Sequence, residues 1–200
     1  MSDHYYSENP AVQSSKKSWA FELAGHSFTF RSDSGVFSKN EVDFGSRVLI
    51  DAFEMPEPAG SILDMGCGYG PIGLALAKKF PSRHVDMADI NARAIELAKE
   101  NAALNQISNV SIFQSDLYTQ AKDQRYAAIV TNPPIRAGKK VVHEILEKGF
   151  DHLVSGGELW AVIQKKQGAP SAVAKLEEHF EEVGVVQKKK GYYIIRAKKD

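Results

Sequence analysis

One short segment restricts the fold of this chain more than any other. Ile62-Leu-Asp-Met-Gly-Cys-Gly-Tyr-Gly70 is an apolar strand pattern that runs into a glycine cluster, and Pro71 then opens a helix. Because glycine lacks a Cβ, such a turn can adopt positive φ and approach a ligand closely. The residues concerned are Gly66, Gly68 and Gly70, with Asp64 at the strand end placed to order the loop or face a cation. A tight turn without a ligand remains the alternative.

Strands and helices alternate after a connector at Met55–Gly60. Apolar runs and helical spacing predict elements at 61–65, 71–79, 84–88, 91–105, 110–113, 126–131, 140–153, 159–164 and 170–183. Two further strands, at 185–188 and 192–196, flank Lys189-Lys-Gly191, which has the spacing of a hairpin turn. The order predicts a Rossmann-like, doubly wound α/β fold. Its seven-stranded sheet is mostly parallel, with one antiparallel edge strand and helices on both faces.

The first 57 residues follow a different pattern. Alternating runs at Ala20–Leu23 and His26–Phe30 predict a hairpin, Gly35–Ser38 follows a turn, and Asp43–Phe53 has helical spacing. We therefore expect a hairpin and helix over residues 1–57 that form a lid or flank. The main α/β part then covers residues 58–200, within a single domain overall.

Composition excludes several classes of protein. The 200 residues are 43% apolar and 25% charged, as in ordinary globular proteins, and the start shows no basic and apolar leader. No apolar run is long enough to span a bilayer, so we expect a soluble, cytoplasmic protein without a membrane partner. The single Cys67 cannot form an internal disulfide, and the six histidines lack zinc-ligand spacing, so no metal is expected.

Acidic residues follow two further strands. Asp89 lies about 20 residues beyond the glycines, where an acid can accept hydrogen bonds from ribose hydroxyls. It can equally cap the helix that starts near Asn91. Ser115-Asp116 would lie on the same sheet edge, where a carboxylate can bind an adenine amino group, or be a simple loop acid. Together these positions favour a nucleoside-containing cofactor.

The strand at 126–131 ends in Asn132-Pro-Pro-Ile135, the most specific feature of the sequence. The prolines donate no backbone hydrogen bonds and stiffen the chain. The Pro133 carbonyl and the Asn132 side-chain oxygen can therefore be fixed as acceptors for the two hydrogens of an amino group. Holding both N–H groups would orient the nitrogen lone pair towards an electrophilic methyl group. A rigid turn that merely ends the strand is the alternative.

These segments, in this order, resemble the class I S-adenosylmethionine-dependent methyltransferases over residues 58–200. The upstream stretch Gly35–Ser46 narrows the resemblance to the small methyltransferase domain of ribosomal RNA small-subunit methyltransferases of the C type, which modify a guanine exocyclic amine. The resemblance implies S-adenosyl-L-methionine as cofactor. Its implied binding residues are Phe37, Asp43, Asp64, Gly66, Cys67, Gly68, Gly70, Asp89, Ile90, Ser115, Asp116 and Asn132. The implied catalytic residues are Asn132, Pro133, Pro134 and Ile135.

Within that resemblance, different residues contact different parts of the cofactor. Asp64, Gly66 and Gly68 would line the methionine part, while Asp89 would hold the ribose and Asp116 the adenine. Phe37 and Asp43 would close the site from the upstream segment.

The chain departs from that family in two respects. Members with the ribosomal guanine activity carry two tandem domains and an aromatic residue after the prolines, whereas this chain has one domain and Ile135. An aromatic ring there would stack on a flat base, and Ile135 offers only an apolar wall. Substrate identity is therefore less constrained than cofactor identity.

Two other features bear on chemistry. Cys67 lies inside the glycine loop, away from the prolines, so a buried small thiol is favoured over a nucleophile. Residues 161–200 hold 9 Lys and Arg against 5 Asp and Glu, so an anionic partner should meet the C-terminal part. Lys165 and Lys166 follow a strand end and are candidates for phosphate contacts, whereas Lys188–Lys190 are expected to form a solvated face.

The expected function is methylation of an exocyclic amine, in guanine of ribosomal RNA or a ribosomal subunit precursor, by a monomer or homodimer. The base would have to be extruded or unpaired. Three alternatives stay open. A protein glutamine or small-molecule amine is also a planar nitrogen with two hydrogens, and a non-catalytic RNA-binding assembly factor would use the same pocket. A nicotinamide-dependent oxidoreductase also fits the glycine loop, but leaves the proline pair unexplained.

Overall fold

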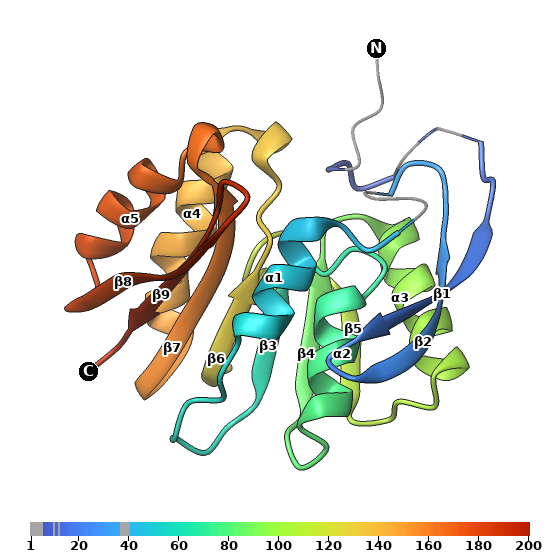
Figure 1. The fold of residues 1–200 in the computed structure, drawn as a ribbon, viewed down its shortest axis with the longest axis horizontal. Coiled ribbons are helices and arrows are strands. Elements are labelled where there is room, and N and C mark those ends of the chain that lie inside the picture. Colours follow the sequence, from blue (N-terminus) through green and yellow to red (C-terminus); the bar gives the residue numbers. More distant parts are fainter. Residues whose placement is uncertain (1–5, 10, 12, 37–40) are drawn as a thin grey trace.

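The computed structural model describes residues 6–9, 11, 13–36 and 41–200 and shows a sheet covered by helices on both faces (Figure 1). The sheet has the strand order β5-β4-β3-β6-β7-β9-β8. Its strands are β3 (Ile62–Met65), β4 (Val85–Asp89), β5 (Val110–Gln114), β6 (Tyr126–Thr131), β7 (Leu153–Gln164), β8 (Glu182–Lys189) and β9 (Tyr192–Lys198). The helices are α1 (Phe44–Ala52), α2 (Pro71–Lys79), α3 (Ala92–Leu104), α4 (Lys139–Gly149) and α5 (Ala169–Glu177). The predicted Rossmann-like α/β fold is confirmed.

The direction of pairing changes at one side of the sheet. Strands β3 to β7 pair in parallel, whereas β9 pairs antiparallel with both β7 and β8. Lys190 and Gly191 join β8 to β9 with φ of 48° and 81°, the two positive values that a tight hairpin turn requires. The antiparallel edge predicted from this turn is confirmed, with β9 lying between β7 and the edge strand β8.

Two apolar cores lie on opposite faces of the sheet. One face packs against α1, α2 and α3, with fully buried residues such as Leu49, Leu74 and Leu97. The other face packs against α4 and α5, through residues such as Leu146 and Leu176. The central strand β6 is buried along its whole length, as expected for a parallel strand covered on both sides.

The N-terminal hairpin joins the first of these cores. Strands β1 (Lys17–Leu23) and β2 (His26–Ser32) pair antiparallel, and Phe28 and Phe30 of β2 are buried against the helices. The side-chain amide of Asn101 in α3 bonds the backbone of Arg31 through both its oxygen (2.7 Å) and its nitrogen (2.9 Å), and Asn105 does the same at Thr29. These two asparagines occupy the outer edge of β2 as a neighbouring strand would.

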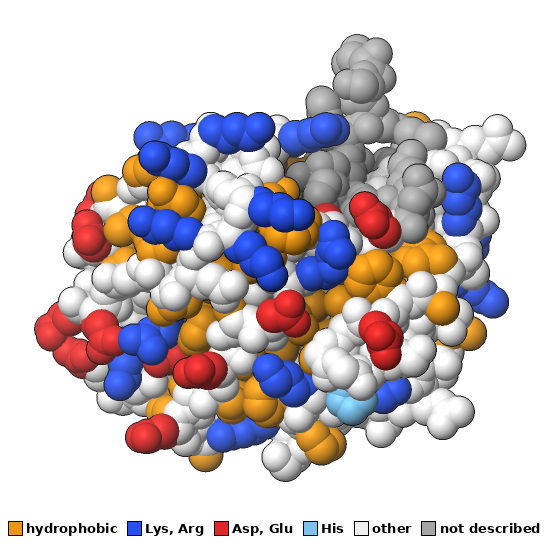
Figure 2. Space-filling model, viewed as in Figure 1, with side chains coloured by type: hydrophobic (Ala, Val, Ile, Leu, Met, Phe, Trp, Pro, Cys, Tyr) orange, Lys and Arg blue, Asp and Glu red, His pale blue; other side chains and the backbone are white. Residues whose placement is uncertain are grey.

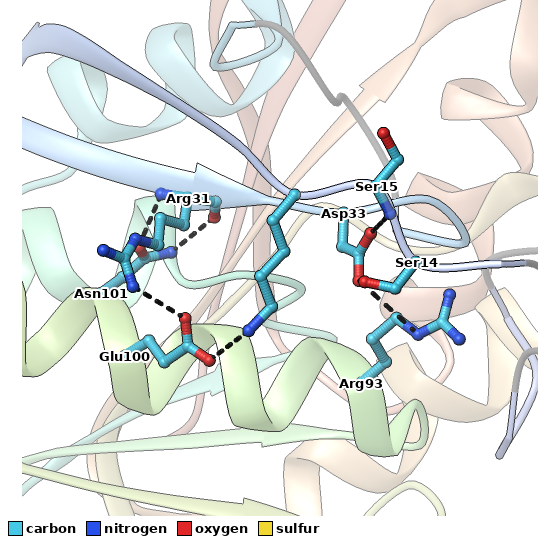
Figure 3. Close-up of polar contacts among 8 residues, drawn as sticks. Ser14, Ser15, Arg31, Asp33, Arg93, Glu100 and Asn101 are labelled. Atoms are coloured by element: carbon cyan, nitrogen blue, oxygen red, sulfur yellow. Dashed lines mark hydrogen bonds and ion pairs between the residues drawn. The ribbon is translucent and has the colours of Figure 1, made fainter.

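Polar contacts also fasten the segment before β1 to α3 (Figure 3). Asp33 accepts hydrogen bonds from the Ser14 hydroxyl and the Ser15 backbone, and Lys16 pairs with Glu100 at 2.6 Å. Burial opposes ionisation of Asp33, yet the hydrogen bonds from these serines and from Ser34 hold its pKa below the ordinary value. The carboxylate is therefore the charged centre of this attachment.

Two expected helices have different boundaries. The helix expected at 170–183 ends at Glu177, because Val183 and Val185 pair with β9 in the strand β8. The helix expected at 140–153 ends at Gly149, and β7 already begins at Leu153, which pairs with Tyr126. The turn expected before Gly35–Ser38 includes Gly35 itself, which has φ of 82°. Phe37 and Ser38 lie outside the described residues.

Candidate active site

The carboxyl ends of β3, β4, β5 and β6 meet at one edge of the sheet and surround a cavity of about 300 Å³. The start of α1 and the first residue of β9 complete its wall. Eleven of the sequence-predicted site residues line it: Asp43, Gly66, Cys67, Gly68, Asp89, Ile90, Ser115, Asn132, Pro133, Pro134 and Ile135. Asp64, Gly70 and Asp116 do not line the cavity, and Phe37 lies outside the described residues.

The glycine loop forms one wall. Gly66 and Gly68 have φ of 76° and 57°, a region that other residues adopt at a cost. A Cβ at either position would meet no atom within 4 Å, so each position faces open space in the cavity. Gly70, with φ of 106°, is the N-cap of α2. The wall is therefore smooth backbone against which a bulky ligand can lie.

Asp64 supports this loop from beneath. Its side chain is fully buried, and its Oδ2 accepts a hydrogen bond from the Gly73 backbone N–H at 2.8 Å. A Cβ at Gly73 would lie 2.9 Å from that oxygen, so the contact depends on glycine there. Burial raises the pKa of Asp64 from 3.8 to about 7, although the Gly73 bond lowers it. Its Oδ1 is a buried oxygen without a hydrogen-bond partner among the described residues.

Asp89 links the glycine loop to the next turn. Its Oδ2 accepts from the Gly68 N–H at 2.8 Å, and its Oδ1 accepts from the Asn91 N–H at 2.9 Å. The cap of α3 is Asn91 itself, whose side chain accepts from Ala94 N–H, so the alternative that Asp89 caps this helix is wrong. Burial raises the pKa of Asp89 despite these backbone donors.

The loop after β5 also borders the cavity, through Ser115 and Leu117. Ser115 is buried and donates its hydroxyl proton to the Leu117 carbonyl at 2.7 Å, so its hydroxyl serves the loop. Asp116 is exposed beside it. Tyr6 lines the cavity from the N-terminal segment, and burial together with the nearby charges of Asp116 and Asp89 raises its pKa.

Asn132 is held by the N-terminal part of the chain. Its side-chain nitrogen donates to Asp43 Oδ2 at 3.0 Å and to Ser46 Oγ at 3.1 Å. Asp43 is also the N-cap of α1, accepting from the Ser46 N–H. With both amide hydrogens engaged, the side-chain oxygen of Asn132 is left as an acceptor on the cavity wall.

The two prolines that follow Asn132 also line the cavity. Both X–Pro bonds are trans, and the Pro134 carbonyl accepts from Ala137 N–H at 2.9 Å in the turn Ile135–Ala137. No hydrogen bond to the Pro133 carbonyl is found within the described part of the chain. Ile135 is half-buried and packs against the core on the α4 and α5 face. Asn132 and Pro133 thus provide two candidate acceptors from consecutive residues that line the cavity.

The remaining polar groups do not suggest other chemistry. Burial raises the pKa of the Cys67 thiol well above its ordinary value, so it stays protonated and is a poor nucleophile. Among the described residues, no group of three or more His, Cys, Asp or Glu side chains is placed to hold a metal ion. No helix in that part of the chain is long and apolar enough to cross a membrane.

Sequence reasoning assigned no role to Ser46, Tyr6 or Tyr192. Ser46 contacts Asn132 across 86 residues of sequence, and Tyr192 reaches the cavity because β9 starts at this edge of the sheet. Only the short stretch after Gly35 carried a signal, since Ser46 stands three residues after Asp43, the spacing at which an N-cap side chain meets a backbone N–H.

Comparison with known proteins identifies the family of this chain. Residues 27–196 match the family model described as methyltransferase small domain. A Bacillus subtilis (strain 168) protein described as "Uncharacterized protein YbxB" is 66% identical over the full length of both chains. A Vibrio cholerae ribosomal RNA small subunit methyltransferase C is 35% identical over 92% of this chain and 53% of its own length. This chain therefore spans about half of that relative.

Solved structures show the same fold. The T. thermophilus 16S rRNA N2 G1207 methyltransferase in complex with AdoMet and guanosine superposes with a TM-score of 0.84. It is 23% identical, and the match covers 96% of this chain and 52% of that one. The family match covers well over half of the sequence. The chain therefore belongs to the methyltransferase small domain family of S-adenosylmethionine-dependent methyltransferases.

Proposed function

We propose that this protein methylates the exocyclic amine of a guanine in ribosomal RNA or a ribosomal subunit precursor, in the cytoplasm. The observation that carries the proposal is the fixed amide of Asn132. Asp43 and Ser46 engage its hydrogens, so that its oxygen and the Pro133 carbonyl are both available to a substrate N–H₂ group. The relatives named ribosomal RNA small subunit methyltransferase C support ribosomal RNA as the substrate.

The cavity fits S-adenosyl-L-methionine. Gly66 and Gly68 leave room where side chains would stand, and the Asp89 carboxylate reaches the wall beside them. We assign Asp89 and Ile90 to the nucleoside part, with Ser115 and Asp116 at the adenine end, and the glycine loop to the methionine part. When bound, the cofactor supplies an electrophilic methyl group. Residues 1–57 act as an extension that closes this site, with Asp43 as its contact to Asn132.

Within this proposal, the protein acts by positioning. Asn132 and Pro133 accept the two amine hydrogens, which directs the nitrogen lone pair into the cavity. Pro134 and Ile135 fix the turn that carries them, and Ile135 gives an apolar wall for the base. No side chain forms a covalent intermediate, in keeping with the protonated Cys67 thiol.

A planar amide of a protein glutamine is the second candidate substrate. Ile135 favours glutamine as substrate, because an aliphatic side chain offers no flat face at the position where an aromatic ring would stack on guanine. The same two acceptors would serve either amide or amine.

The test is methyl transfer to defined substrates. Purified protein with labelled S-adenosylmethionine is given protein-free small-subunit ribosomal RNA, intact subunits, or ribosomal proteins, and the products are digested and analysed by mass spectrometry. We expect N2-methylguanosine in the RNA. Label found in glutamine, or absence of label from every substrate although the cofactor binds, would refute the guanine assignment.

A further inference from the structure

A group of basic and aromatic side chains lies beside the cavity mouth, on the β8–β9 turn and the start of α1. Lys188 and Lys189 at the end of β8 and Lys190 in the turn are exposed, and the Lys188 ammonium lies 4.8 Å from the ring centre of Tyr193. The ammonium groups of Lys189 and Lys190 lie 6.0 and 5.0 Å from the ring centre of Phe44, the first residue of α1. The Phe44 ring in turn lies 5.5 Å from the ring of Tyr192, which lines the cavity.

Arg47 extends this group along α1. Its guanidinium lies over the rings of Phe21 and Phe44, at 5.6 and 5.3 Å. Its Nε is buried and has no hydrogen-bond partner among the described residues. The arginine is thus held by aromatic faces rather than by a carboxylate.

The turn also meets the second basic cluster of the chain. The Lys165 N–H donates to the Gly191 carbonyl at 2.9 Å, and Gln164 pairs with Tyr192 in the sheet. Lys165 and Lys166 are therefore neighbours of Lys188–Lys190, although more than twenty residues separate them in sequence. Figure 2 shows Lys and Arg side chains gathered over this part of the face.

Among the described residues, these cations have no acidic partner in an ion pair. Several other lysines form ion pairs, such as Lys148 with Glu144 and Lys175 with Glu178. Within the described ranges, no carboxylate lies within 4 Å of the five lysines of the two clusters or of Arg47. In the part of the chain that the structure describes, their positive charge is not paired with a carboxylate and is available to an anionic ligand.

We propose that this basic rim binds single-stranded RNA. It contacts the part of the strand that flanks the nucleotide entering the cavity. It comprises Phe44, Arg47, Lys165, Lys166, Lys188, Lys189, Lys190 and Tyr192. The lysines contact backbone phosphates, and Phe44 and Tyr192 contact a flanking base, the combination by which proteins bind single strands. The inference rests on the proposed function and deepens it, because only an unpaired strand can place a base in the cavity while its phosphates cross the rim. It reassigns Lys188–Lys190 from a solvated face to a binding surface.

The test compares two double variants that lose the same charge. Lys189→Gln with Lys190→Gln alters the rim, whereas Lys78→Gln with Lys122→Gln alters two lysines at the opposite edge of the sheet. Lys78 is a matched control, because its ammonium also lies over an aromatic ring, that of Phe28, at 5.2 Å. Affinity for a labelled twelve-nucleotide single-stranded RNA is measured by fluorescence anisotropy from low to high salt. Thermal unfolding confirms that both variants fold.

We expect the rim variant to bind RNA about tenfold more weakly at low salt, with a salt slope smaller by roughly one to two, and the control variant to match the wild type. Equal losses in the two variants, or none in either, would overturn the proposal. So would weaker binding of an acidic peptide with unchanged RNA binding, which would assign the rim to a protein partner.

A separate measurement distinguishes this proposal from the proposed function. Wild-type protein is assayed for methyl transfer to free guanosine, which has no phosphates to meet the rim. Transfer to guanosine with equal RNA affinity in the two variants would leave the guanine activity standing and refute the rim. Rim-dependent RNA binding without transfer to guanosine or RNA would refute the guanine activity alone.

Discussion

The two walls of the cavity are built in different ways. The glycine wall is held by backbone N–H groups that donate to Asp64 and Asp89, within consecutive strand and helix units. The Asn132 wall is held by side-chain bonds to Asp43, 89 residues earlier in the chain, and to Ser46. The first wall therefore depends on the local fold, and the second depends on how the N-terminal helix docks. A change in that docking can alter substrate handling and leave the cofactor wall intact.

Asn132→Ala should separate the two walls most sharply. It removes the side-chain acceptor and leaves the glycine loop unchanged, so the loss falls on the methyl-transfer step. One positioned hydrogen bond is worth about 1–3 kcal/mol, or roughly 5- to 150-fold in rate. Single-turnover transfer at saturating cofactor and substrate measures it, with cofactor affinity by calorimetry as the control. An unchanged rate would exclude Asn132 from the reaction.

Asp89→Ala should have the opposite signature. It removes the acceptor for the Gly68 and Asn91 N–H groups and the carboxylate at the cavity wall. We expect S-adenosylhomocysteine affinity to fall roughly tenfold to a hundredfold, equivalent to one or two such hydrogen bonds. RNA affinity should stay within about twofold of the wild type. Calorimetry and anisotropy measure the two, and an equal loss in both would make Asp89 a general structural residue.

Asp64→Asn should change how stability depends on pH. Burial raises the folded-state pKa of Asp64 to about 7, above its unfolded value of 3.8. Between these values the unfolded chain has lost the proton that the folded chain keeps, so the wild type loses stability as pH rises. The asparagine side chain of the variant binds no proton in this range. The stability of the variant relative to wild type should therefore increase by about 1.4 kcal/mol per pH unit from pH 5 to 7.

Urea unfolding of both proteins at pH 5, 6 and 7 measures this difference. Asp33→Asn is the control, because the pKa of Asp33 is lowered, so the proton exchange of that group lies below this window. Parallel profiles for Asp64→Asn and wild type would contradict a buried Asp64 that takes up a proton near neutral pH.

Asp43→Ala should lower the methyl-transfer rate less than the other substitutions change their measured quantities. It tests the contact between the N-terminal helix and the Asn132 wall. It removes the N-cap of α1, which costs about 1 kcal/mol of stability, and releases the Asn132 amide. Because Asn132 itself remains, we expect the rate to fall only about threefold to tenfold, equivalent to about 1 kcal/mol. Asp43→Asn keeps an acceptor oxygen and should restore most of the rate. A rate loss in Asp43→Ala equal to that of Asn132→Ala would mean that Asp43 also contacts the substrate.

The difference between local contacts and contacts between distant segments also explains which site residues the sequence could predict. The glycine loop, Asp89 and Asn132-Pro-Pro each stand at a strand end, and the parallel order of strands brings such ends to one edge of the sheet. Tyr6 and Tyr192 reach the cavity through contacts between distant segments, for which local patterns carry no signal. For Ser46, the local spacing from Asp43 indicates only the helix cap and not the contact with Asn132. The end of α5 at Glu177 was likewise set by pairing of β8 with β9, since Val183 and Val185 suit either element by composition.

Asn101 of α3 and Asn105 at its C-terminal cap have a consequence for the state of the chain in a crowded solution. A hairpin strand with free backbone groups is a template on which a second molecule can add its own strand. Asn101 and Asn105 occupy those groups at Arg31 and Thr29 from within the same molecule. Helix α3 thereby removes one open edge of the N-terminal hairpin as a seed for aggregation, and it does so with two amides in place of a third strand.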